Sequence, residues 1–202
     1  MEKSVSIAAE LFLEHGIESV RMTDVAERSG VGVATLYRYF GTKTGLTIAS
    51  MTYLWNELRR MFSGIFESEV FLSQTGLKQL TDLMRMYLVL HTAHRDFMRL
   101  LGEFDLFLIR EGVAQEDLYE YEASIINFYP VVEKSFRTGC EDGTVRTDVD
   151  FALFYRTYTH ALMELSKKLL QGEILPSDDF SSGEYELQML IDTAVYFLAR
   201  KE

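Results

Sequence analysis

The scarcity of proline and the spacing of apolar residues limit this chain to helices. Its 202 residues include two prolines, Pro130 and Pro176, and no segment alternates apolar and polar residues over the length of a strand. Apolar residues recur instead every three or four positions, which is the spacing of the buried face of an amphipathic helix. The sequence therefore predicts an all-α protein.

Residues that stop or start helices divide the chain into about nine predicted helices. Gly16, Gly30 and Gly41 are expected to stop the first three, because a residue without a Cβ tolerates the backbone conformation of a C-cap. Pro130 is expected to break or kink the seventh, since proline lacks a backbone donor. Polar N-caps are expected at Thr23, Thr42, Thr147 and Ser181. The predicted helices cover residues 4–15, 23–30, 33–40, 43–62, 73–93, 96–112, 115–138, 147–171 and 181 onward.

Composition and the absence of motifs exclude several classes of protein. One cysteine, Cys140, leaves no internal disulfide framework and fits a cytoplasmic protein. No apolar run is long enough to span a membrane, and the first residues have no signal-peptide pattern. No recognised set of catalytic residues and no Cys/His metal spacing is present, so neither an enzyme nor a cofactor or metal site is predicted.

Charge is spread unevenly along the chain, whose formal net charge is −11. Residues 1–45 hold five basic and six acidic residues, whereas the remainder holds 15 basic and 25 acidic ones. The acidity therefore belongs to the C-terminal part. The overall charge neither excludes nor supports nucleic-acid binding by the N-terminal part.

The second and third predicted helices have the arrangement of a helix-turn-helix, because a tight turn with Gly30 joins them. Ala26 is small where the two helices must cross. Val25, Val31 and Leu36 are expected to pack inward. A purely structural group of three helices would show the same pattern and remains an alternative.

The stretch AAELFLEHGIESVRMTDVAERSGVGVATLYRYFGTKTGL resembles the DNA-binding domain of the TetR (tetracycline-repressor-like) transcriptional regulators over about residues 5–47. The matching motifs are Ala-Ala-x-x-Leu-Phe in the first helix, the His15-Gly16 turn, Gly30-Val31, and Thr-Leu-Tyr-x-Tyr-Phe followed by Lys43. The resemblance implies a ligand-responsive homodimer that binds double-stranded operator DNA, usually as a repressor. It also implies a helix-turn-helix domain over residues 1–47 and a helical ligand-binding and dimerisation domain over residues 48–202.

Two departures from the family pattern concern phosphate contacts. Gly32 and Val33 stand where the family often has a serine and a basic or polar residue, and only Met1-Glu2-Lys3 precede the first helix. We therefore expect DNA binding to depend strongly on base and shape readout. A truncated start is an alternative explanation for the missing basic arm.

The third helix is predicted to lie in the major groove with its first residues at the base edges. Val33 and Ala34 can touch a thymine methyl, Thr35 can hydrogen-bond a base or a phosphate, and Arg38 can reach a guanine or a phosphate. Lys43, in the first turn of the next helix, is expected to bind a phosphate. The predicted DNA contacts are Thr23, Val33, Ala34, Thr35, Tyr37, Arg38, Tyr39 and Lys43. A core position is the alternative for Tyr39.

Aromatic residues crowd the C-terminal part and predict a pocket for a small apolar effector among the fifth, sixth, seventh and eighth helices. A few polar groups set among apolar ones are typical of small-molecule sites, although most of these aromatics are expected to form core. A glutamate beside aromatic faces would suit a cationic apolar ligand. The predicted lining is Tyr87, His91, Glu103, Phe104, Phe107, Tyr129, Tyr155 and Tyr158, with Glu103 as the charged contact.

The last two predicted helices, residues 147–171 and 181 onward, carry apolar residues on more than one side. Each can bury one side on its own domain and keep apolar surface for a partner. We expect two copies of the chain to pair through these helices as a four-helix bundle. A helical scaffold or adaptor without DNA binding remains the alternative function.

Overall fold

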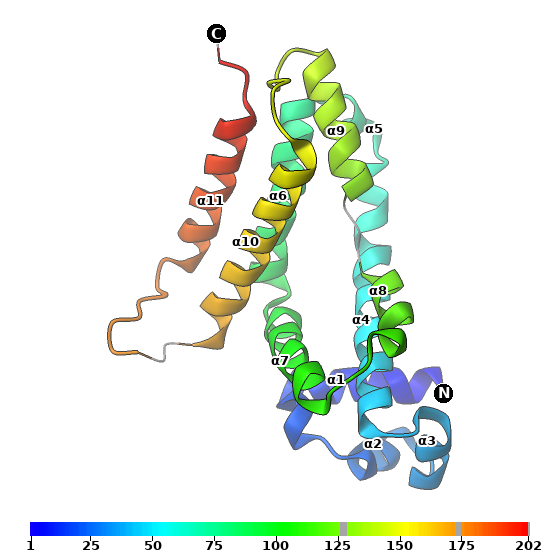
Figure 1. Cartoon of the computed structure of the whole chain (residues 1–202). Helices are drawn as coiled ribbons and strands as arrows, with labels where there is room; N and C mark the ends of the chain where they lie inside the picture. Colours follow the sequence, from blue (N-terminus) through cyan, green and yellow to red (C-terminus); the bar gives the residue numbers. More distant parts are fainter. Residues whose placement is uncertain (126–128, 173–174, 202) are drawn as a thin grey trace. The chain divides into compact units, whose positions relative to one another are not determined.

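The computed structural model describes residues 1–125, 129–172 and 175–201, and most of these are helical. The helices are α1 (Glu2–Ser19), α2 (Met22–Ser29), α3 (Val33–Phe40), α4 (Lys43–Phe66), α5 (Glu69–Leu72), α6 (Gly76–Ala93), α7 (Arg95–Glu111), the 3-10 helix η1 (Gln115–Leu118), α8 (Tyr119–Ser124), α9 (Tyr129–Glu141), α10 (Phe151–Gln171) and α11 (Gly183–Leu198) (Figure 1). The described residues contain no strand, only an isolated bridge between Val145 and Ala199. The all-α prediction is confirmed.

The chain divides into two compact units, and each combines two separate stretches of sequence. Unit 1 consists of Met1–Phe62 and Arg99–Ile126, and unit 2 consists of Ser63–Met98 and Asn127–Glu202. Helix α4 continues without a break through position 47, where the sequence predicts a domain boundary. That boundary stays a prediction.

In unit 1, α1 packs against α2 and α2 against α3. Phe12, Val25 and Leu36 are buried at this junction, as their spacing predicts for Val25 and Leu36. Gly16 interrupts α1 with φ 77° and ψ 162°, a combination open essentially to glycine alone. The predicted stop of the first helix at this glycine is therefore confirmed, and a short turn of helix follows it.

Of the two N-caps predicted in unit 1, Thr42 is confirmed and Thr23 is wrong. Thr42 caps α4, because its hydroxyl accepts a hydrogen bond from the backbone N–H of Gly45 at 3.1 Å. The predicted cap at Thr23 is wrong. Helix α2 begins at Met22, and the Asp24 carboxylate accepts a hydrogen bond from the N–H of Arg21, the residue at the N-cap position, at 2.8 Å. A carboxylate at the third helical position thus starts the helix earlier.

The two predicted N-caps in unit 2, Thr147 and Ser181, are also wrong. Helix α10 starts after Asp150, whose side chain accepts a hydrogen bond from the N–H of Leu153 at 3.0 Å, and not after Thr147. Helix α11 starts at Gly183 with Ser182 at the N-cap position, and the Ser181 hydroxyl donates to Asp179 at 2.6 Å. At α10 the Asp150 carboxylate is a stronger acceptor than the Thr147 hydroxyl.

The predicted helix over residues 115–138 is replaced by η1, α8 and α9, and residues 126–128 lie outside the described part of the chain. Pro130 is the second residue of α9. A proline at this position breaks no hydrogen bond, because the first amides of a helix have no partner inside it. Pro130 therefore helps to begin α9. Of the two predicted alternatives, a break or a kink, the structure has the break, since α9 starts one residue before Pro130.

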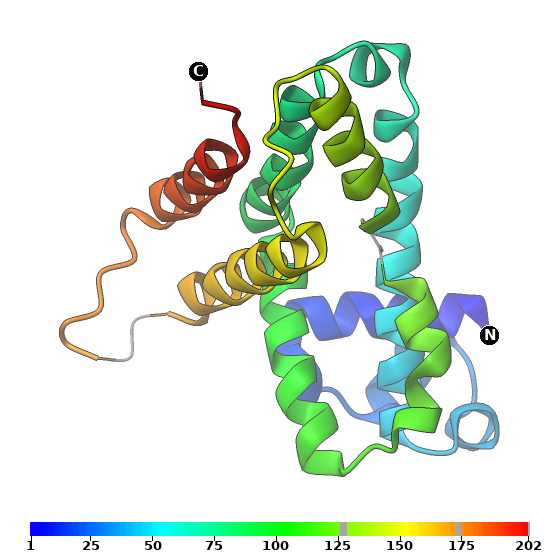
Figure 2. The ribbon, with the colours of Figure 1, turned by 45° about the horizontal axis from the view of Figure 1, so that its top comes forward.

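Helix α6 is the central element of unit 2, and α9, α10 and α11 all pack against it. Figures 1 and 2 both show α9 alongside α6. The two helices approach most closely at Gly76 and Gly139, where a Cβ added to Gly76 would lie 2.0 Å from the Gly139 backbone nitrogen. Leu80, Leu162 and Ile191 are fully buried around this central helix.

Backbone hydrogen bonds tie the residues after α11 to the turn between α9 and α10. The N–H of Arg146 donates to the carbonyl of Leu198, and the N–H of Arg200 donates to the carbonyl of Thr144, both at 3.0 Å. Helix α11 is thereby held to unit 2 at its end as well as by its buried side. Within the described ranges, no helix has the length and apolar composition required to cross a membrane.

Candidate nucleic-acid interface and effector pocket

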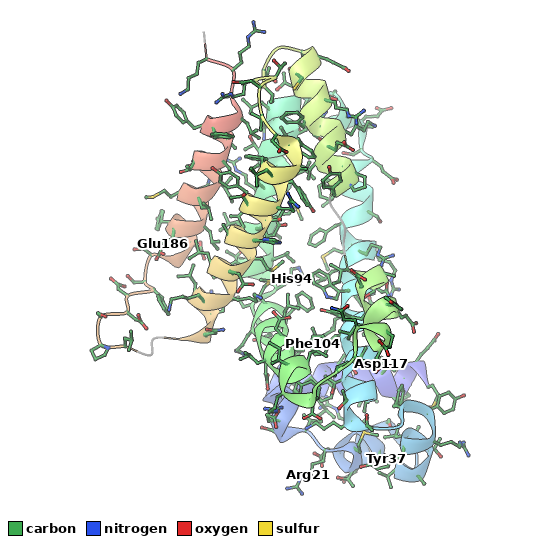
Figure 3. All side chains as sticks on the ribbon, in the orientation of Figure 1. Arg21, Tyr37, His94, Phe104, Asp117 and Glu186 are labelled. Carbon is green, nitrogen blue, oxygen red and sulfur yellow. The ribbon has the colours of Figure 1, made fainter. Side chains whose placement is uncertain are left out.

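Helix α3 packs one side against the rest of unit 1 and leaves the other side exposed to solvent. Leu36 is fully buried, whereas Tyr37 and Tyr39 are 50% and 63% exposed. Figure 3 shows Tyr37 on this short helix. The core alternative for Tyr39 is therefore wrong. A helix of eight residues is too short to persist alone, so its packing on α2 presents this exposed side.

The eight predicted DNA contacts lie on three consecutive elements, α2, α3 and the first turn of α4. Thr35 and Lys43 are half-buried. The other six are exposed, namely Thr23, Val33, Ala34, Tyr37, Arg38 and Tyr39. The structure therefore places all eight where solvent reaches them, and their contacts with DNA stay predictions.

Ion pairing distinguishes the arginines of the helix-turn-helix. Arg28 contacts Glu14 at 3.1 Å and Glu10 at 3.6 Å, so its charge is already balanced. In the part of the chain that the structure describes, Arg38 has no carboxylate within ion-pair distance. Arg21, which is not among the predicted contacts, is exposed at the N-cap position of α2 (Figure 3). Because Arg21 is a basic residue directly before α2, we add it to the candidate DNA contacts.

Lys43 joins the start of α4 to the end of α1. Its ammonium donates a hydrogen bond to the backbone carbonyl of Glu18 at 3.2 Å. An ammonium has three donors, so two remain for a phosphate. Lys43 therefore contributes to the fold of unit 1, and its contact with a DNA phosphate stays a prediction.

Three of the predicted effector contacts line one cavity in unit 2. They are Tyr87 of α6 and Tyr155 and Tyr158 of α10, and Phe154 completes the aromatic part of the wall. The cavity has about 20 Å³, which is room for about one water molecule. Tyr129 stands beside it, with its ring edge-on to that of Tyr155 at 5.0 Å between centroids. Burial raises the pKa of Tyr87 and of Tyr155, so both hydroxyls stay neutral donors.

His91 lies outside this cavity lining, buried between α6 and α10. Its Nδ1 is 3.0 Å from the hydroxyl of Ser166, so the ring has a polar partner. Burial lowers the pKa of His91, and the neighbouring Arg95 lowers it further, while Glu184 acts in the opposite direction. The imidazole is therefore neutral at pH 7.

We expect His91 to make unit 2 sensitive to acid. Because its pKa is lower in the folded state, the unfolded chain binds a proton first as the pH falls below the ordinary histidine pKa of 6.5. The stabilising contribution is thus present above that pH and is lost as the pH falls toward the folded pKa. Urea unfolding at pH 7.5 and 5.5 should show a smaller loss of stability in His91→Gln than in the unmodified protein. Equal losses would contradict this prediction.

The other predicted effector contacts, Glu103, Phe104 and Phe107, belong to α7 in unit 1. Phe104 is fully buried (Figure 3), stacks with Phe107 at 6.5 Å and meets Tyr121 edge-on at 5.1 Å. The Tyr121 hydroxyl accepts a hydrogen bond from Trp55, and burial raises its pKa to about 12. The predicted lining is thus distributed over two units, and its role in effector binding stays a prediction.

The N-terminal helices match a known sequence family. Residues 5–49, which cover α1 to α3 and the start of α4, match the model of the bacterial regulatory proteins of the tetR family. This N-terminal segment is a domain of the tetR family. The helix-turn-helix interpretation of α2 and α3 is confirmed, and α1 to α3 form the DNA-binding domain of a transcriptional regulator.

Solved structures of several transcriptional regulators share the fold over nearly the whole chain. A TetR transcription regulator from Haloarcula marismortui superposes with a TM-score of 0.75 at 16% identity, covering 98% of this chain and 97% of that one. A protein from Saccharomonospora viridis in complex with choline gives 0.70 at 16% identity, covering 99% and 97%. FadR from Bacillus subtilis in complex with stearoyl-CoA gives 0.63 at 13% identity, covering 98% of both chains. No curated protein sequence matches this chain.

Proposed function

We propose that this protein is a ligand-responsive repressor that leaves its operator when a small apolar effector binds. The observation that carries the DNA-binding part is the exposed side of α3, held in a helix-turn-helix by the buried Leu36. Such a helix fits the major groove, where base edges present a distinct pattern of donors and acceptors. Since the chromosome is the partner, we place the protein in the cytoplasm.

A gel-shift experiment tests the proposed function. The probe is the upstream region of the protein's own operon, and a DNA fragment of the same length and scrambled sequence serves as the control. We expect binding to the upstream region that unlabelled scrambled DNA does not displace. Equal affinity for both fragments would favour non-specific binding, and no shift at all would favour the scaffold alternative.

Lys43→Ala is expected to weaken DNA binding about equally on all sequences. Removal of one phosphate contact should reduce the slope of log affinity against log salt by roughly one. Lys78→Ala is the matched control, because Lys78 is exposed in unit 2 and pairs with Asp82. A changed sequence preference with an unchanged salt slope would show that Lys43 does not bind a phosphate.

We propose that a second copy of the chain packs on α10 and α11. Tyr185, Met189 and Tyr196 of α11 are 76%, 70% and 67% exposed, and their spacing places them on one side of the helix. Leu187 and Ile191, on the other side, are fully buried within unit 2. Leu153 adds exposed apolar surface on α10. A helix with apolar residues on both sides supports a buried partner interface.

We propose the cavity of Tyr87, Tyr155 and Tyr158 as the effector site. Several aromatic faces around one cavity would hold an apolar cation through cation–π contacts as well as a neutral aromatic molecule. The complexes of the S. viridis protein with choline and of FadR with stearoyl-CoA support small-molecule binding in this fold. Since the cavity has about 20 Å³, an effector must separate α6 from α10 to enter. We propose that α4, which continues from Lys43 to Phe66, carries this change to the DNA-binding domain.

An effector that releases DNA must bind less tightly when operator is present, because linkage between the two sites is reciprocal. A typical coupling of ~1–3 kcal/mol corresponds to roughly a 5- to 150-fold change in effector affinity. Thermal shift with choline, other apolar cations and neutral aromatics, each with and without operator, measures this change. Tyr158→Ala should lose the response to any hit. Equal affinity with and without operator would mean that the cavity does not control DNA binding.

A further inference from the structure

Glu103 of α7 contacts the backbone of α1 at the glycine that interrupts it. The carboxylate Oε1 accepts a hydrogen bond from the backbone N–H of Ile17 at 2.8 Å. A Cβ built on Gly16 would lie 3.0 Å from both carboxylate oxygens. The absence of a side chain at Gly16 thus permits this close approach as well as the positive φ of the turn.

The turn at Gly16 explains why this acceptor is needed. Because φ is 77° at Gly16, the helical hydrogen-bond pattern of α1 stops and the N–H of Ile17 requires another partner. Ile17 is fully buried, so leaving that N–H without an acceptor would be unfavourable. The Glu103 carboxylate supplies a charge-assisted hydrogen bond, which is stronger than one to a neutral acceptor.

Two further side chains of α7 contact the same part of α1. Arg99 donates to the backbone carbonyl of Leu13 at 3.5 Å, and Arg110 forms an ion pair with Glu18. Positions 99, 103 and 110 lie on one side of a helix, because they are separated by four and seven residues. Residues 13–18 are therefore held from the side of α7, and Glu103 provides the central contact.

We propose that Glu103 is a positioning residue for DNA recognition. By fixing Ile17, it sets the direction in which the chain leaves α1, and α2 begins at Met22, only five residues later. Since α2 packs on both α1 and α3, a displaced turn changes the orientation of the helix that reads DNA. The proposal rests on the proposed DNA-binding function and gives Glu103 a different task from the effector contact that the sequence suggests.

Two variants of Glu103 distinguish the positioning role from a charged effector contact. Glu103→Gln keeps the length of the side chain and an acceptor oxygen but removes the charge. Glu103→Asp keeps the charge but is shorter by one C–C bond, about 1.5 Å, and cannot reach Ile17 from the same backbone position. We expect Glu103→Gln to bind operator within about threefold of the unmodified protein, and Glu103→Asp to bind roughly 10- to 100-fold more weakly.

Hydrogen exchange separates a local effect on the turn from a loss of stability. In Glu103→Asp we expect faster exchange in the peptide that covers residues 13–21, with unchanged exchange in α6 and α10, at a temperature well below unfolding. A second expected effect is that this variant tolerates operators with one base pair added between the half-sites, which the unmodified protein rejects. Glu116→Gln, an exposed glutamate in η1, is the control and should match the unmodified protein.

Several outcomes would overturn the inference. If Glu103→Asp binds operator as well as Glu103→Gln does, or if exchange over residues 13–21 is unchanged, Glu103 does not position the turn. A lower unfolding temperature with unaltered operator affinity would reduce Glu103 to a purely structural residue. If the unmodified protein binds no operator, the proposed function itself fails. If it binds operator and Glu103→Asp binds equally well, only the inference about Glu103 fails, so the two failures are distinguishable.

Discussion

Gly76→Ala is expected to lower the free energy of unfolding of unit 2 by more than about 3 kcal/mol, or to prevent its folding. The added Cβ would lie 2.0 Å from the nitrogen and 2.3 Å from the Cα of Gly139, and 2.6 Å from the carbonyl oxygen of Ser135. All three are backbone atoms, so no side chain can rotate away, and α6 and α9 must separate. Because α6 is the central helix of unit 2, their separation exposes the core around Leu80.

Thermal unfolding followed by circular dichroism measures this effect, with Gly64→Ala as the matched control. Gly64 also lies inside a helix, α4, but a Cβ there would meet no atom within 4 Å. The control should therefore gain about 0.5–1 kcal/mol, since alanine favours helix over glycine. A loss of 3 kcal/mol corresponds to a lower midpoint by about 6–12 °C for a chain of this size. Similar midpoints for both variants would show that α6 and α9 are less closely packed than the structure indicates.

If two chains pair through α10 and α11 as proposed, Met189→Glu combined with Tyr196→Glu is expected to convert the dimer to a monomer and to weaken operator binding by more than about 100-fold. Both side chains lie on the exposed side of α11, so the change leaves the buried side with Leu187 and Ile191 intact. In a dimer, each glutamate would be buried without a partner charge and would repel its symmetry-related copy. Loss of the second subunit removes half of the contacts with a two-part operator.

Light scattering at micromolar concentration and a gel shift test this double variant. Ile109→Glu is the control, because Ile109 is an exposed apolar residue of α7 in unit 1 and not on α10 or α11. It should remain dimeric and bind operator normally. A double variant that stays dimeric would place the subunit interface on another surface.

The features that the sequence predicts well depend on local interactions. The bounds of α3 and the start of α4 follow from Gly32, Gly41 and Thr42, whose effects act within one turn of the chain. The prediction of an N-cap is wrong where two nearby polar residues can both accept a hydrogen bond from the first amides of a helix. Thr147 and Asp150 both suit the start of α10, and the preference of the Leu153 amide for the carboxylate decides between them.

The predicted effector lining could not be located from the sequence, because it depends on contacts between residues far apart in the chain. Glu103 and Phe104 are neighbours in sequence, but consecutive residues of a helix point about 100° apart. Phe104 therefore packs with Tyr121, whereas Glu103 reaches the backbone of Ile17. Only the packing of α7 against α1 determines this orientation. From the sequence alone, a glutamate next to aromatic residues is equally compatible with a ligand contact and with a hydrogen bond to the backbone.

The hydrogen bonds that join Leu198 and Arg200 to the turn after α9 have a consequence for synthesis on the ribosome. Unit 1 has all of its segments once the chain reaches residue 126, whereas unit 2 lacks α11 and its closing backbone bonds until residue 200. The roughly 70 intervening residues take about 4–14 s to translate. During that interval a nascent chain can fold its DNA-binding domain while Leu80 and Leu162 still lack Ile191 as a neighbour. Chaperones that shield apolar segments are therefore expected to act on unit 2 and not on unit 1.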